Sequence, residues 1–247
     1  MQPYERIFVA LDVDDLGKVA ELVENLSPYV GGFKIGMQLA TSVGVPQAVE
    51  FVHAHGGKVF LDQKFKDIPN TVASASAVAA RLGVMMFNLH ADGGSEMMEA
   101  AMKAVEKHFV EHRKRPLVLG VTVLTSIDSP ALKEIGYPDK VALKPDLLVT
   151  KLALLAFNAG LDGVVASARE ADSIRGVLCD TAFTIVTPAI RPEWADWAPA
   201  GDQKRPTTHM EAIKAGADYI VVGRPILKAP NPVDAAKRIA DELAAVA

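Results

Sequence analysis

The sequence has very little of what several classes of protein require. It holds one cysteine, Cys179, among 247 residues, so no internal disulfide can form. Its 26 lysines and arginines are outnumbered by 30 acids, so it has none of the basic excess that nucleic acids and anionic membranes attract. No apolar run approaches the ~18 residues that cross a bilayer, and acidic residues interrupt the N-terminal stretch where a signal peptide is apolar. We therefore expect a cytoplasmic protein that binds neither nucleic acid nor membrane.

Apolar residues, in contrast, make up half of the chain, which is enough for a packed core. Many of them gather in eight short runs that are nearly continuous rather than alternating. This pattern is typical of strands that are covered on both faces. The eight runs are 7–13, 31–37, 58–64, 85–90, 116–124, 163–167, 183–190 and 219–226.

Stretches with apolar residues at helical spacing lie between these runs, at 14–26, 46–57, 68–83, 93–109, 145–160 and 234–246. Eight strands that alternate with helices over roughly 250 residues predict an α/β protein with a single (β/α)8 barrel domain spanning 1–247. A doubly wound open sheet is the structural alternative, but no G-x-G-x-x-G follows the first strand. A barrel places its chemistry at the C-terminal ends of the strands.

The expected strands end in polar residues. A single polar residue there is often only a cap or a loop anchor, but opposed charges converging on one rim favour a functional site. These residues are Asp12, Lys34, Asp62 with Lys64, Asn88 with His90, Thr125 with Ser126, Thr187 and Arg224.

The segment around the third strand carries the densest charge. Asp62 and Lys64 are two residues apart on a strand and share a face, and Asp67 follows just before the next helix. With Lys34 from the neighbouring strand, the chain offers two cations and two anions, although a salt-bridge cluster that caps the helix would use the same residues. Carboxylates beside lysines favour the protonated ammonium. An ammonium is a poor partner for Schiff-base formation but can donate a proton to a carbanion.

At this point the residues resemble a known family. The pattern D-x-K-x-x-D-I-P-x-T in DQKFKDIPNT is similar to the signature of the orotidine 5′-phosphate decarboxylases. Further motifs stand in the order that the family has them over essentially the whole chain. They are VALDVDD, GGFKIG, NLHADGG, VTVLTS, VTPAIRP, GDQKR and VVGRPI.

The resemblance implies roles for individual residues and an enzyme that works without a cofactor or metal. Asp62 would face the substrate carboxylate, Lys64 would protonate C6, and Lys34 would lie near the ribose and the carboxylate. Asp12 would bind the ribose and Thr125 the pyrimidine. Asp67 and Thr71 would reach into the site of a neighbouring subunit, so the active unit would be a homodimer. The phosphate end would be lined by Arg191, Gln203, Gly223 and Arg224.

The residues themselves also favour a phosphate site. Gly223 and Arg224 follow the eighth strand, and barrels commonly bind phosphate after strands seven and eight. Residues 188–205 are too rich in proline and glycine for a long regular element, so we expect a lid. Its Trp194 and Trp197 would either cover the closed site or pack on the barrel. Ala189 stands where the family usually has glycine.

Two other functions are open to such a chain. A barrel with a similar array of Asp and Lys can decarboxylate a sugar-acid phosphate with Mg²⁺, as the ketogulonate-phosphate decarboxylases do. A catalytically dead barrel could bind nucleotide phosphates as a sensor. No other spacing of His, Cys or carboxylates predicts a metal site, and Cys179 is expected to be a small buried residue.

Overall fold

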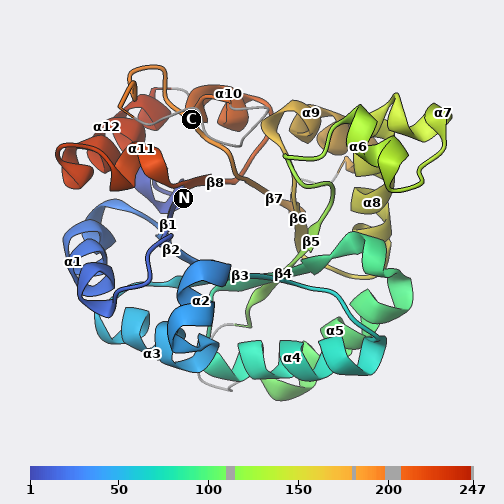
Figure 1. The fold of residues 1–247 in the computed structure, drawn as a ribbon, viewed down its shortest axis with the longest axis horizontal. Coiled ribbons are helices and arrows are strands. Elements are labelled where there is room, and N and C mark those ends of the chain that lie inside the picture. Colours follow the sequence, from blue (N-terminus) through green and yellow to red (C-terminus); the bar gives the residue numbers. More distant parts are fainter. Residues whose placement is uncertain (110–114, 180–181, 198–206, 246–247) are drawn as a thin grey trace.

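The computed structural model describes residues 1–109, 115–179, 182–197 and 207–245. Eight parallel strands close into a barrel in sequence order, with β8 pairing back onto β1 through Ile7 and Ile220. Helices surround this barrel (Figure 1). The chain is therefore a (β/α)8 barrel, as predicted. The strands are β1 Ile7–Ala10, β2 Gly32–Ile35, β3 Val59–Phe65, β4 Met86–His90, β5 Leu117–Val121, β6 Gly163–Val165, β7 Thr184–Thr187 and β8 Tyr219–Val222.

The helices form the outer layer, and most of the longer ones were predicted. The helices are α1 Leu16–Leu26, α2 Met37–Val43, α3 Val45–Ala54, α4 Pro69–Leu82, α5 Ser95–His108, α6 Ser129–Glu134, α7 Asp139–Ala142, α8 Pro145–Asn158, α9 Ala168–Leu178, α10 His209–Lys214, α11 Arg224–Leu227 and α12 Pro232–Ala244. Short 3-10 turns lie at Pro3–Arg6, Ser27–Tyr29 and Ala91–Gly93.

Helix α1 shows how the sequence sets these elements. Asp15 begins the helix because its carboxylate accepts a hydrogen bond from the Lys18 amide. Its apolar residues then recur at helical spacing and are buried against the barrel. Helix α12 begins in the same way at Asn231.

The apolar core has two parts. The larger lies between the strands and the helices. The smaller fills the barrel interior, where the ring of Phe8 meets those of Phe60 and Tyr219 edge to face, with centroids 6.2 and 5.6 Å away. Side chains therefore fill this part of the barrel, which is a packed core and not a pore.

Most strands are shorter than their apolar runs at the C-terminal end. The fifth run was expected to reach residue 124, but β5 ends at Val121, so Thr125 and Ser126 lie in the following loop. Arg224 does not end a strand either, because it is the first residue of α11. Apolar residues continue past the last ladder hydrogen bond since the loops also cover the core. The prediction for Cys179 was wrong: it is exposed at the end of α9 with φ of 50°.

Candidate active site

A charged array stands at the C-terminal ends of β2 and β3. Lys64 Nζ donates to Asp62 Oδ1 at 2.6 Å, and the other oxygen of Asp62 lies 3.4 Å from Lys34 Nζ. Lys34 Nζ is also 3.4 Å from Asp12 Oδ1. The Asp62 side chain is only 12% exposed, whereas that of Asp12 is 54% exposed. The charges therefore alternate along the array, in the order Lys64, Asp62, Lys34 and Asp12.

This array differs from the predicted one in its second anion. Asp67 forms no ion pair within the described part of the chain; its carboxylate accepts a hydrogen bond from the Ile68 amide at 2.7 Å. Asp67 and Thr71 are both exposed, at the start of α4. Within one chain, the second anion of the array is therefore Asp12, which lies beside Lys34.

Asn88 of β4 holds the array in place, and no role was predicted for it. Its buried amide donates to Asp62 Oδ1 at 2.7 Å and accepts from the Lys64 amide at 2.8 Å. The sequence signal was a polar residue at a strand end, but that signal did not say which residues it would contact. Asn88 therefore fixes both the carboxylate and the backbone that carries the lysine.

The backbone at Lys64 is unusual. Its φ is 52°, in the left-handed region that non-glycine residues rarely adopt, and the pairing of β3 with β4 shifts register between Leu61 and Phe65. Such irregularities re-aim side chains next to active sites. The strain is consistent with a functional demand on the direction of this side chain.

Electrostatics keep the central carboxylate ionised. Burial raises the pKa of Asp62, but the charges of Lys34 and Lys64 and the hydrogen bonds from Lys64 and Asn88 outweigh it, so this pKa lies below its usual value. Nearby, burial lowers the pKa of His90, which stands at the end of β4 3.6 Å from Asp92. Asp62 is therefore negative at neutral pH, and it lies between two ammonium groups.

The array borders a cavity of about 250 Å³ at the C-terminal end of the barrel. Lys34, Asp62 and Lys64 line one side, and Thr125 lies among the residues of the other. Phe60 and Val221, which belong to the inner core, also line it and close it from below. Its remaining lining residues are Val121, Val123, Leu124, Ser126, Val165, Ala166 and Pro188. The cavity thus combines an apolar body with a few converging charges, as ligand sites do.

Two glycines lie beside the array. A Cβ on Gly36 would come 2.8 Å from Lys34 Nζ, which is too close for an ordinary contact. A Cβ on Gly223 would stand 3.7 Å from both Ala10 Cβ and Asp12 Oδ2. Gly223 therefore lies beside Asp12, so the predicted ribose and phosphate residues are neighbours. No role was predicted for Gly36.

The other phosphate-side residues lie on the same end of the barrel. Arg224 follows Gly223 directly, and Arg191 lies four residues after β7. The loop that carries Arg191 is tied at its base, because the Arg191 amide donates to Thr207 O at 2.9 Å and Ile190 pairs with Thr207. Gln203 lies outside the described residues, as does 198–205 of the predicted lid. Trp194 and Trp197 do not line the cavity but pack against outer helices.

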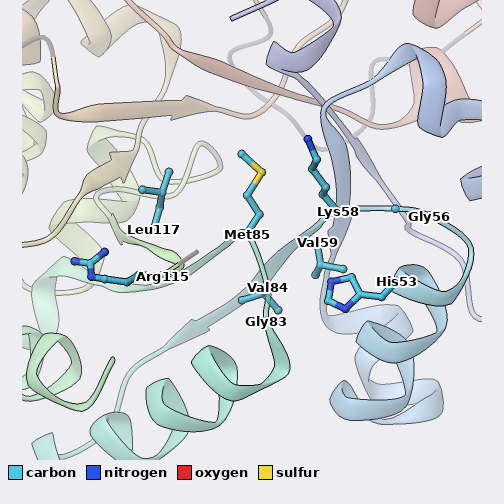
Figure 2. Close-up of a pocket in the computed structure, with 10 residues that line it drawn as sticks. His53, Gly56, Lys58, Val59, Gly83, Val84, Met85, Arg115 and Leu117 are labelled. Carbon is cyan, nitrogen blue, oxygen red and sulfur yellow. The ribbon is translucent and has the colours of Figure 1, made fainter. Parts of the chain in front are cut away.

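A larger cavity, of about 750 Å³, lies at the opposite end of the barrel. Figure 2 shows its labelled residues, which come from the end of α3 and from the starts of β3, β4 and β5, among them His53, Lys58 and Arg115. Arg115 is already paired with Asp162 and Glu106. The N-terminal end of a barrel serves stability rather than chemistry. We therefore assign the smaller cavity to the reaction.

The described residues contain neither a group of metal ligands nor a membrane-spanning helix. Within them, no three His, Cys, Asp or Glu side chains are grouped so as to hold a metal ion. None of the helices in the same ranges is long and apolar enough to cross a membrane.

Known proteins resemble the chain throughout its length. The model of the orotidine 5′-phosphate decarboxylase / HUMPS family matches residues 5–239. A protein of Trichlorobacter lovleyi named orotidine 5′-phosphate decarboxylase is 51% identical over 240 residues, which are 97% of this chain and 95% of that protein. One of the same name from Moorella thermoacetica is 49% identical over 98% of this chain and 94% of its own.

Solved structures agree with these relatives. The crystal structure of orotidine 5′-phosphate decarboxylase from Lactobacillus acidophilus has a TM-score of 0.82 and 32% identity, and it covers 96% of this chain and 98% of its own. That of an uncharacterized conserved protein from Geobacillus kaustophilus has a TM-score of 0.78 and 36% identity, with coverage of 96% and 99%.

Fold and site together define a (β/α)8-barrel enzyme with a buried array of Asp and Lys at the mouth of the barrel. The family match and the relatives at about half identity narrow this class to one group. The chain belongs to the orotidine 5′-phosphate decarboxylase / HUMPS family, and within it to the carboxy-lyases.

Proposed function

We propose that the protein converts orotidine 5′-phosphate to uridine 5′-phosphate and CO2 in pyrimidine biosynthesis, without a cofactor. The observation that carries this proposal is the ionised Asp62 held between Lys34 and Lys64 at the wall of a cavity. Relatives named for this activity support the choice of substrate.

The array suits the loss of a carboxylate. A substrate carboxylate that enters beside Asp62 brings two negative charges together in a partly dry cavity. At ~4 Å and an effective dielectric near 20, their repulsion is on the order of 4 kcal/mol. Departure of CO2 removes that repulsion, so the transition state is stabilised relative to the bound substrate.

Lys64 is our candidate for the proton donor. The C6–carboxylate bond breaks, CO2 leaves, and the electron pair stays on C6. A proton from Lys64 Nζ then bonds to C6, and the neutral amine regains a proton from solvent. The contact of Lys64 Nζ with Asp62 Oδ1, at 2.6 Å, holds the Lys64 ammonium beside the position proposed for the substrate carboxylate.

The remaining residues bind the three parts of the nucleotide, which are the pyrimidine, the ribose and the phosphate. Thr125 across the cavity contacts the pyrimidine, and Asp12 together with Lys34 binds the ribose. Arg191, Gln203, Gly223 and Arg224 hold the phosphate. The neighbouring positions of Gly223 and Asp12 support this order.

We also propose that two copies of the chain share their sites. Asp67 and Thr71 are exposed at the start of α4, and Ile68 between them is 67% exposed. An exposed isoleucine between an exposed carboxylate and an exposed hydroxyl suits burial against a second copy. In the homodimer, these residues complete the active site of the partner subunit. We take the enzyme to be cytoplasmic.

The decisive experiment follows orotidine 5′-phosphate by its ultraviolet absorbance in the presence of purified protein. We expect turnover that is unchanged after incubation with EDTA. A strict requirement for Mg²⁺ would favour the sugar-acid phosphate reaction instead. The absence of any turnover, with nucleotide still bound, would indicate a sensor.

A further inference from the structure

A cluster of side chains outside the cavity links the loop after β7 to the C-terminal helices. It consists of Trp194 and Trp197 from the loop, His209 from α10, and Arg238 and Glu242 from α12. None of these residues lines the cavity. The mechanism above does not use them.

Glu242 is the centre of the cluster. One of its oxygens, Oε2, accepts from Trp194 Nε1 at 3.0 Å and lies 2.7 Å from His209 Nε2. The other accepts from Arg238 Nε at 3.0 Å. The Arg238 guanidinium also lies over the Trp194 ring, 4.4 Å from its centroid. Trp194 is thus held at its edge and on its face by one turn of α12.

The second tryptophan extends the cluster to the phosphate side. The ring of Trp197 is 5.7 Å from that of Trp194, and its Nε1 donates to Pro225 O at 3.3 Å. Pro225 directly follows Arg224. Trp194 lies three residues after Arg191, whose backbone is already tied to Thr207. The cluster therefore joins the segments that carry both arginines assigned to the phosphate.

His209 is the deeply buried member of this cluster. The His209 side chain is 1% exposed, and within the described residues neither of its ring nitrogens has a well-aligned hydrogen-bond donor or acceptor. Burial lowers the pKa of His209, so the imidazole is neutral. Burial raises the pKa of Glu242, but hydrogen bonds from Trp194 and Arg238 and the nearby positive charge bring it below its usual value. An ionised carboxylate is thus fixed 2.7 Å from a ring nitrogen of a buried, neutral histidine.

We infer that Glu242 and Trp194 are positioning residues for phosphate binding, because they fix the loop that carries Arg191 relative to the helix that carries Arg224. This inference rests on the proposed function. Neither residue touches substrate, so their effect reaches the reaction through the two arginines. Pre-organising the loop reduces the ordering cost of binding.

The test compares the steady-state kinetics of Trp194→Phe, Glu242→Ala and Glu242→Gln with those of the wild type on orotidine 5′-phosphate. Loss of a charge-assisted hydrogen bond should raise KM about tenfold in the first two variants, with kcat within about twofold. Glu242→Gln keeps an acceptor for Trp194 and should restore much of the affinity. Inhibition by uridine 5′-phosphate should weaken by the same factor as substrate binding.

The matched control is Asp241→Ala, which removes an exposed carboxylate from the same turn of α12. It should leave KM unchanged. A lower Tm with an unchanged KM in Trp194→Phe and Glu242→Ala would show a purely structural role and overturn the inference. If Glu242→Ala does not fold, the kinetics of Trp194→Phe decide alone, because phenylalanine keeps an aromatic ring at this position. A wild-type protein without turnover would refute the proposed function itself, and the inference with it.

Discussion

At the scale of the residue, the contacts of Asp62 decide what the site can do. Its two oxygens are shared among two ammonium groups and one amide, so it stays ionised although it is nearly buried. Lys64 is held with its backbone in a left-handed conformation. Two predictions concern these side chains.

Replacing Lys64 with alanine removes the proposed proton donor. We expect kcat to fall by about 10³-fold or more, because the carbanion would have to take its proton from water. Circular dichroism should show a folded protein, and the exposed Lys18→Ala serves as control. Near-normal turnover in folded Lys64→Ala would assign the proton transfer to another group.

Replacing Asn88 with alanine removes one of the hydrogen bonds that lower the pKa of Asp62. The pKa of Asp62 should rise, so the acidic limb of the pH–kcat/KM profile should move to higher pH. The pKa of Asp62 is lower in the folded protein than in the unfolded chain. Its ionised carboxylate therefore stabilises the fold at pH values above the unfolded pKa, and this stabilisation is lost as the pH falls through the folded pKa. The variant should therefore resist acid less well than the wild type.

The loss of the Asn88 contact should also lower kcat/KM by about 10- to 100-fold at neutral pH. The exposed Asn25→Ala provides the control for stability and activity. An acidic limb that stays in place would mean that Asp62 does not control the profile.

At the scale of the element, the loop after β7 carries a conformational cost. Ala189 is buried with φ of 66°, where a side chain meets its own backbone. Glycine would adopt this conformation without that contact. The loop nevertheless forms, since Ile190 pairs with Thr207 beyond it.

Ala189→Gly should therefore stabilise the protein. Relief of the left-handed strain, less the added entropy of glycine in the unfolded chain, should raise the free energy of unfolding by about 0.5–1 kcal/mol. Urea denaturation measures the change. Ala195→Gly, in the same loop without a positive φ, should instead destabilise. Equal destabilisation by both substitutions would show that the loop gains nothing from glycine at 189.

Arg224 at the start of α11 provides a second test at this scale. Arg224→Ala should lower kcat/KM for orotidine 5′-phosphate. The lost contact with the phosphate corresponds to about 1.5–3 kcal/mol of transition-state stabilisation, or more. Activity on orotidine, which has no phosphate, should change little. Equal losses on nucleotide and nucleoside would make Arg224 a structural residue.

At the scale of the whole molecule, the exposed start of α4 predicts sites shared between subunits. Mixing inactive Asp67→Asn with inactive Lys64→Ala subunits should restore activity, since one site of each mixed dimer regains both groups. With random exchange, about a quarter of wild-type activity is expected. No recovery, after mass spectrometry has verified the exchange, would show that each site is built from one chain.

The sequence by itself determined the fold class of this protein, the eight strands and most of its longer helices. The eight nearly continuous apolar runs and the helical spacing between them are local properties of the sequence. The pairing of Asp62 with Lys64 was equally local, because two residues on one strand share a face.

Only the tertiary structure decided which residues meet. Closing the barrel brings Asn88 from β4 against Asp62 and places Asp12 from β1 beside Lys34, while Asp67 turns outward. It also brings Trp194 to Glu242, 48 positions further along the chain. Such contacts depend on strand register, loop path and helix packing. These are set by the free energy of the whole core, and no short stretch of sequence carries them.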